Sequence, residues 1–369
     1  MTRRLLHLNG LAIIGAVAYH ASGWGFVAMF WWAHRYRPVT PPNFDQMGSA
    51  AYYGLRTIEQ LIAFGVPAFL FVSGFFAAFA GGKSRGSVGW RVVANRIRSL
   101  VIPYLLWSLA MIAIEYVQGR TYSALELVRT IAFGEVTPAF YFVPLLCQLY
   151  LLSPLLIPWA RTRWKPLLVG AAVLQTAVHL ARYGLILGVG EPGRGLLAAI
   201  SPGWFFPGNI FWFALGAVVG FHQREAIEFL ARFRRLWIAG VMALLPLGIL
   251  EWEALLRLSG EVWLTPKETV LDNLYSLMFI LAFLSLVSLE HPLSKPVSDL
   301  GARSYGIYLV HPLALTVAAR ATYHLAPWML GSQLLFQPLL LAAGLGIPLL
   351  LMALVRRSPA RWSYQFQFG

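Results

Sequence analysis

The chain has 369 residues, of which 58% are hydrophobic and only 12% are charged. Its mean hydropathy of +0.65 excludes a soluble globular domain and indicates one integral membrane domain over residues 1–369, without a separate soluble domain. The formal net charge is +14. The basic residues fall in short segments between apolar stretches, however, which favours membrane topology over nucleic-acid binding.

The first apolar stretch, residues 8–32, follows the basic pair Arg3 and Arg4. This arrangement imitates a cleaved signal peptide, but the apolar residues continue without a polar break through Trp32, so we interpret the stretch as a retained span. His20 would lie about 20 Å from the cytoplasmic end of this helix. An ionisable group at that depth is costly unless it faces protein or a wet cavity, which makes His20 a candidate functional residue. A histidine that only bridges two packed helices is the alternative.

Nine more apolar stretches follow, which predicts an all-α bundle of about ten transmembrane helices with both termini in the cytoplasm. Charge sets this orientation, because 19 of the 29 basic residues then fall in cytoplasmic segments. Segments 118–139 and 189–204 would lie outside. Several prolines interrupt the stretches and would kink helices where these line an interior cavity. The expected spans are 8–32, 57–80, 100–117, 140–159, 167–188, 205–221, 236–257, 269–289, 304–325 and 334–355.

Polar side chains in the first two spans suggest a site. Asn9 and His20 are eleven residues apart, close to three helical turns, so both project from one face of the first helix. Glu59 begins the second span. A bond from its carboxylate to His20 would fix the imidazole tautomer and strengthen the other nitrogen as a base. A glutamate bound to Arg56 or to water is the alternative.

Two further polar groups have both a structural and a functional interpretation. The segment from Lys83 to Arg98 carries five basic residues just inside the membrane, where it would set topology or touch anionic headgroups, or else hold a phosphate. Ser304, Tyr308 and His311 share one face of the ninth span. Hydrogen-bonded helix packing explains them, but a second intramembrane histidine favours function.

Soluble-enzyme motifs are absent from the sequence. It has no glycine-rich phosphate loop, no zinc-binding histidine pair and no nucleophile elbow. Its single cysteine, Cys147, lies in an apolar span, and His179, His291 and His324 are scattered along the chain. We therefore predict no metal site.

Taken together, these segments resemble the acyltransferase 3 family of integral membrane acyltransferases, which includes glucan-modifying and O-antigen-modifying enzymes. The resemblance covers about residues 5 to 312, and its segments occur in the family's order. No single segment is highly specific, and the ordered set carries the likeness. The segments are Leu8–Ile13, Tyr19–Ala21, Phe64–Phe75, Arg98–Tyr104, Tyr141–Leu145, Leu151–Leu155 and Ser304–Pro312.

The resemblance implies transfer of an acyl group, often acetyl, from cytoplasmic acyl-CoA to a hydroxyl of a glycan or lipid-linked sugar, at the cytoplasmic membrane and among its lipids. The family's catalytic first-span histidine is matched by His20, to which we add Glu59 as its expected partner. Asn9 stands where the family usually has an arginine. The residues expected to bind the acyl-CoA are Asn9, Ser73, Arg96, Arg98, Tyr305 and His311.

Two alternatives remain open at this point. A transporter or flippase of a glycan or acyl compound would use His20 as a proton relay. A catalytically silent membrane scaffold is suggested only by Asn9.

Overall fold

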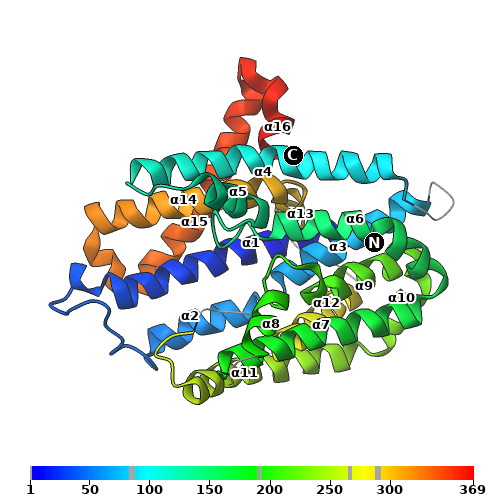
Figure 1. Ribbon diagram of the computed structural model, residues 1–369, viewed down its shortest axis with the longest axis horizontal. Coiled ribbons are helices and arrows are strands. Elements are labelled where there is room, and N and C mark those ends of the chain that lie inside the picture. Colours follow the sequence, from blue (N-terminus) through cyan, green and yellow to red (C-terminus); the bar gives the residue numbers. More distant parts are fainter. Residues whose placement is uncertain (1, 83–87, 189, 191–192, 265–267, 287–291) are drawn as a thin grey trace.

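The computed structural model describes residues 2–82, 88–188, 190, 193–264, 268–286 and 292–369, and it contains only helices and loops over these ranges. The long helices run side by side along the longest axis of the molecule (Figure 1). The predicted all-α membrane bundle is therefore confirmed. Lys83, Arg85 and His291 lie outside the described residues.

Long helices form the bundle, and shorter helices lie in the segments that connect them. The first helix, α1, continues beyond Phe26 as a π-helical turn, Val27–Trp31, and four short 3₁₀ turns occur elsewhere. The α-helices are α1 (Thr2–Phe26), α2 (Ala50–Leu61), α3 (Gly65–Gly82), α4 (Trp90–Val117), α5 (Ala124–Phe133), α6 (Phe142–Thr162), α7 (Trp164–Ile186), α8 (Gly193–Ile200), α9 (Ile210–Phe221), α10 (Gln223–Arg232), α11 (Arg234–Ser259), α12 (Val270–Ser285), α13 (Ser294–Ala302), α14 (Ser304–Leu325), α15 (Gln333–Arg357) and α16 (Tyr364–Phe368).

Every expected span corresponds to helix in the structure. Seven helical stretches are long and apolar enough to cross a membrane, and α9 and α12 are shorter apolar helices. The ninth expected span corresponds to α14, whose 22 residues include several polar side chains. The side of the membrane on which each terminus lies stays a prediction.

The second span differs from the single helix expected over 57–80. Helix begins earlier, at Ala50, where the hydroxyl of Ser49 accepts a hydrogen bond from the backbone N–H of Tyr52. It then breaks between Leu61 and Gly65. Pro67 lies in the first turn of α3, where its missing N–H is tolerated, so the chain restarts the helix there instead of continuing it. The break leaves the end of α2 inside the bundle.

The core is built around α1, which packs against α2, α3, α13, α14 and α15. Two crossings are so close that only glycine fits. A Cβ at Gly216 of α9 would overlap the carbonyl oxygen of Phe71 on α3, and a Cβ at Gly301 of α13 would overlap that of Leu6 on α1. Such small-residue contacts let membrane helices approach closely. The central position of α1 brings His20 to the interior.

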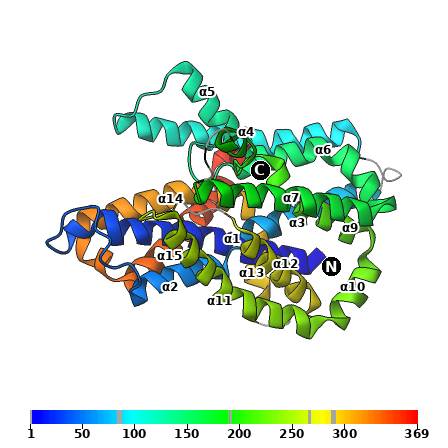
Figure 2. The same ribbon diagram turned by 60° about the horizontal axis from the view of Figure 1, so that its bottom comes forward.

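Short helices lie in the segments between spans and were not expected from the apolar pattern. The segment 118–139 contains α5, which stands out from the bundle in Figure 2. Ser123 caps this helix, and Gly134 ends it with a positive φ of 71°. The segment 189–204 contains α8. Leu125 of α5 and Leu196 of α8 are exposed, as in helices that lie at a membrane surface.

Candidate active site

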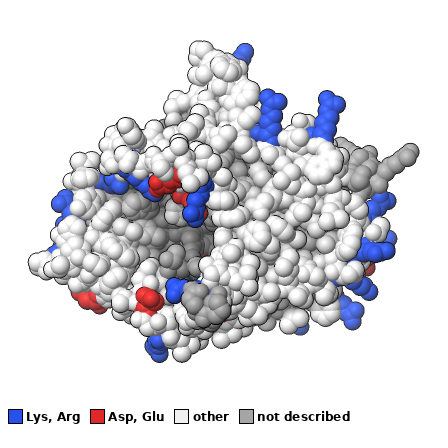
Figure 3. Space-filling view, in the orientation of Figure 1, with Lys and Arg blue, Asp and Glu red and all other residues white. Residues whose placement is uncertain are grey.

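A cavity of about 990 Å³ lies between α1, α2, α3, α4, α7, α11, α12 and α14. Figure 3 shows a deep hollow in the side of the bundle, with charged groups at its rim. The volume is at the upper end of the range for ligand sites. Aromatic side chains form much of the wall, among them Trp24, Phe69, Tyr141 and Trp252. The cavity is therefore large enough for an extended ligand.

His20 lies on the wall of this cavity. Its ring contacts Tyr19 and His311, with a distance of 5.3 Å between the two imidazole centroids, and it makes no hydrogen bond to the described residues. The Nδ1 of His311 lies 2.7 Å from the carbonyl oxygen of Tyr308, so Nδ1 carries the proton and donates it. The buried Nε2 of His311 is then an acceptor without a partner in the described chain.

The expected bond between Glu59 and His20 is not formed. Glu59 instead forms an ion pair with Arg56, one helical turn earlier on α2, and accepts a hydrogen bond of 3.2 Å from Ser22. The Arg56 guanidinium also stacks on Trp252, 3.7 Å from the ring centroid. Both partners are buried, and a cation one turn away competes for the carboxylate more effectively than a neutral imidazole does. The side chain that contacts His20 is instead His311, which the sequence analysis placed among the residues expected to bind acyl-CoA.

The residues expected to bind the acyl-CoA lie outside the cavity wall. Ser73 and Arg96 come together near the hydroxyl of Tyr150, a residue of α6 that sequence reasoning did not select. Arg96 and Arg98 are both exposed on the first turns of α4. Basic side chains also gather at the end of the bundle where the N-terminus and α10 lie (Figures 1 and 3).

Two other expected donor-binding residues have different surroundings. The Tyr305 hydroxyl donates a hydrogen bond to the carbonyl oxygen of Leu100, which joins α14 to α4. This bond gives Tyr305 a role in helix packing, because its donor is already used. The Oδ1 of Asn9 is buried and has no partner among the described residues. The role of Asn9 in donor binding stays a prediction.

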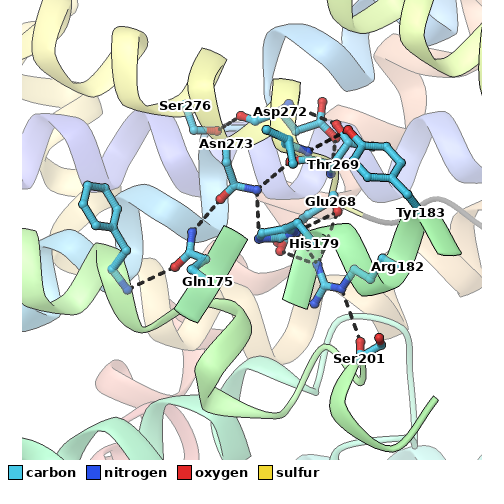
Figure 4. Close-up of polar contacts among 12 residues, drawn as sticks. Gln175, His179, Arg182, Tyr183, Ser201, Glu268, Thr269, Asp272, Asn273 and Ser276 are labelled. Carbon is cyan, nitrogen blue, oxygen red and sulfur yellow. Dashed lines mark hydrogen bonds and ion pairs between the residues drawn. The ribbon is translucent and has the colours of Figure 1, made fainter. Parts of the chain in front are cut away.

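A hydrogen-bonded network that joins α7 to α12 reaches the cavity wall through Arg182, Glu268 and Asp272 (Figure 4). Arg182 pairs with the Glu268 carboxylate at 3.3 Å and donates to the carbonyl oxygen of Ser201. His179 lies between Asn273, at 3.0 Å from Nε2, and the carbonyl oxygen of Glu268, at 3.0 Å from Nδ1. Arg182 and His179 are ionisable residues within one apolar span, and this feature of the sequence could have indicated the network.

The direction of this network follows from one backbone group. The N–H of Phe211 can only donate, so the atom of Gln175 at 3.0 Å from it is the amide oxygen. Gln175 then donates to the Oδ1 of Asn273, and the Nδ2 of Asn273 donates to the Nε2 of His179. His179 then carries its proton on Nδ1 and donates it to the Glu268 carbonyl oxygen, so the Nη1 of Arg182, 3.2 Å from the same Nδ1, is a close contact and not a hydrogen bond.

The charge of the cavity wall is opposite to that of the whole chain. Five acidic and only three basic residues line the cavity, whereas the chain carries a net charge of +14. Two of the three basic residues, Arg56 and Arg182, are already paired with Glu59 and Glu268. A polyanion such as a nucleotide would therefore be repelled from the cavity and attracted to the basic end of the bundle.

The chain is similar to one protein family over most of its length and to individual relatives over about two thirds of it. Residues 7–353 match the model of a family described as an acyltransferase domain. A probable poly-beta-1,6-N-acetyl-D-glucosamine export protein from Staphylococcus aureus strain MRSA252 is 24% identical over 70% of this chain and 71% of its own length. The protein of the same description from strain MSSA476 is 23% identical over the same shares. No solved structure matches the chain.

Proposed function

Because this chain belongs to the acyltransferase 3 family, whose model covers residues 7–353, we propose that it is a membrane O-acyltransferase. It moves an acyl group, such as acetyl, from cytoplasmic acyl-CoA to a hydroxyl of a glycan or lipid-linked sugar. The protein would act in the cytoplasmic membrane. The relatives' description, export of poly-beta-1,6-N-acetyl-D-glucosamine, supports a carbohydrate substrate.

The observation that carries the proposal is a pair of imidazoles, with His20 on the cavity wall and His311 packed against it. His20 faces the cavity, and the Nε2 of His311 is an acceptor without a partner in the described chain. In this proposal, His311 accepts an N–H from His20 and so leaves the other nitrogen of His20 as the base. His20 removes the proton of the acceptor hydroxyl as its oxygen attacks the thioester carbonyl. An ester C–O bond forms, the C–S bond breaks, and the proton passes to the CoA thiolate.

Acylation of His20 itself is a second route to the same products. In that route the imidazole nitrogen attacks the thioester first and CoA leaves before the acceptor hydroxyl takes the acyl group. The two routes differ in one measurable way, because only the second produces an acylated protein when labelled donor is added without acceptor.

The donor's nucleotide would bind at the basic end of the bundle, near Arg96 and Arg98. Guanidinium groups hold phosphates well, and neither arginine has an ion-pair partner among the described residues. Ser73 and Asn9 lie on α3 and α1, which run from this end toward the cavity. The acyl chain would then extend through the bundle toward His20.

The test is turnover by purified His20→Gln protein with radiolabelled acetyl-CoA. Glutamine keeps the size and the hydrogen bonding of the side chain but cannot accept a proton at useful pH. We expect the variant to fold and bind donor and to lose about 10²-fold or more in turnover, as positioned bases usually contribute. Near-normal transfer by the folded variant would refute the role of His20.

A transporter that uses His20 as a proton relay is the second candidate, and the relatives' description as export proteins favours it. Reconstituted vesicles separate the two functions. Movement of a labelled glycan across the vesicle membrane without acyl transfer would support the transporter, and acyl transfer without movement supports the enzyme.

A further inference from the structure

Two carboxylates face the cavity without a basic partner. Glu251 of α11 and Asp272 of α12 both line the cavity, and the described chain has no basic side chain within ion-pair distance of either. The other carboxylates of the wall, those of Glu59, Glu268 and Glu115, are paired with arginines. An intramembrane carboxylate without a partner is costly, and such groups mark sites for substrates or ions.

Both carboxylates lie at the beginning of α12. Asp272 accepts a 3.0 Å hydrogen bond from the backbone N–H of Thr269 and completes a capping box. Glu251 accepts a hydrogen bond from Tyr183, whose hydroxyl in turn accepts the N–H of Val270 at 3.0 Å. The helix dipole contributes only about half a positive unit charge here. The dipole therefore offsets only part of the negative charge of the two carboxylates.

An amide of the same wall supplies an independent sign of a ligand. Gln60 is 5% exposed and lines the cavity beside Asp272, and its Nε2 makes no hydrogen bond of good geometry to the described residues. Its amide lies directly over Gly248, one helical turn before Glu251 on the same face of α11. Leaving a buried donor without a partner is costly, so this donor is expected to bind an acceptor atom of a ligand.

From these groups we propose that the cavity binds an amino sugar, with its protonated amine between Glu251 and Asp272 and one of its oxygen atoms accepting a hydrogen bond from Gln60. This inference rests on the proposed acyl transfer, because it specifies the acceptor as a glycan with free amines. A simple ammonium ion would leave the amide unbound, and an acidic sugar would meet the wall's negative charge. The described residues contain no group of three or more His, Cys, Asp or Glu side chains that could hold a metal ion.

The aromatic walls suit the same ligand. Trp24 and Tyr141 line the cavity, and aromatic rings pack against the apolar faces of sugar rings. The cavity volume of about 990 Å³ leaves room for more than one sugar ring. The amine would thus anchor one residue of an oligosaccharide, while another residue presents its hydroxyl to His20.

Binding of two trisaccharides to the purified full-length protein tests the proposal. The probes are β-linked triglucosamine and tri-N-acetylglucosamine, at low salt and at a pH that keeps the amines protonated. The readout is the fluorescence of the tryptophans, since Trp24 and Trp252 line the cavity. We expect roughly tenfold tighter binding of triglucosamine, the factor typical of a hydrogen bond to a charged group. Added salt should remove most of this preference.

Three variants and one control sharpen the result. Glu251→Gln and Asp272→Asn keep the hydrogen bonds from Tyr183 and Thr269 but lose the charge, so each should weaken binding of triglucosamine and leave tri-N-acetylglucosamine unchanged. Gln60→Met should weaken both probes alike. Glu115→Gln, which removes a carboxylate of the same wall that already has an arginine partner, should change neither.

Equal or tighter binding of tri-N-acetylglucosamine, or an unchanged preference in the two carboxamide variants, would overturn the proposal. The binding assay requires no acyl transfer. Loss of the amine preference in an active transferase would therefore refute this inference alone, and a clear preference in a protein that transfers no acyl group would refute the enzyme function alone.

Discussion

Replacement of Glu59 by glutamine separates a structural ion pair from a catalytic one. The variant leaves the guanidinium of Arg56, whose side chain is only 8% exposed, without its carboxylate. Breaking a buried pair by removing one partner costs about 3–5 kcal/mol. Stacking on Trp252 remains and retains part of the interaction, so we expect the loss to be about 3 kcal/mol. For a protein of this size, whose entropy of unfolding is large, that corresponds to a fall in Tm of roughly 4 °C.

The compensating variant makes this reasoning testable. Arg56→Met in the Glu59→Gln background removes the uncompensated charge and leaves a flexible side chain that still packs on Trp252. Thermal unfolding in detergent, followed by tryptophan fluorescence, should show most of the stability restored. Asp45→Asn is the matched control, because its pair with Arg37 is partly exposed, at 49% and 24%, and should contribute little to stability. A fully stable Glu59→Gln protein with strongly reduced turnover would refute the structural assignment and restore Glu59 as a partner of the chemistry.

Three further predictions concern packing, donor binding and topology. Gly216→Ala should destabilise the fold more than Gly346→Ala, because its methyl group would meet a carbonyl oxygen of α3 whereas Gly346 has open space beside it; thermal unfolding of the two variants checks this. Replacing Arg96 and Arg98 together by glutamine should weaken acetyl-CoA binding in a titration without affecting membrane insertion, and an unchanged donor affinity would return both arginines to a topological role. A cysteine introduced at Ser123 should react with an impermeant reagent only from outside the cell, and labelling only from the cytoplasmic side would reverse the proposed orientation.

The bundle could be predicted from the sequence because each span carries its own apolar signal. Hydropathy over about twenty residues is a local property, so all ten stretches were found, although the break after Leu61 and the short helices were not. The exposed leucines of α5 and α8 belong to amphipathic helices of only 10 and 8 residues, which are too short to give this signal.

The partners within the site depend on how distant helices pack, which no local pattern contains. His20 and His311 are 291 positions apart, and the sequence could offer Glu59 as a partner only because it is the nearest intramembrane carboxylate. The cavity's excess of acidic residues could not be predicted from the sequence for a similar reason. Glu251 and Asp272 come from different helices and face one space only after folding.

The hydrogen-bond network of α7 and α12 has a consequence for proton movement. Proton transfer along a chain of side chains requires each group to exchange its donor and acceptor roles. Here the backbone N–H of Phe211 imposes one polarity on Gln175, Asn273 and His179, and reversal would set two donors against each other. A network held in one direction in this way does not relay protons. A proton taken up by His20 would therefore move through water or toward His311, and not through this network.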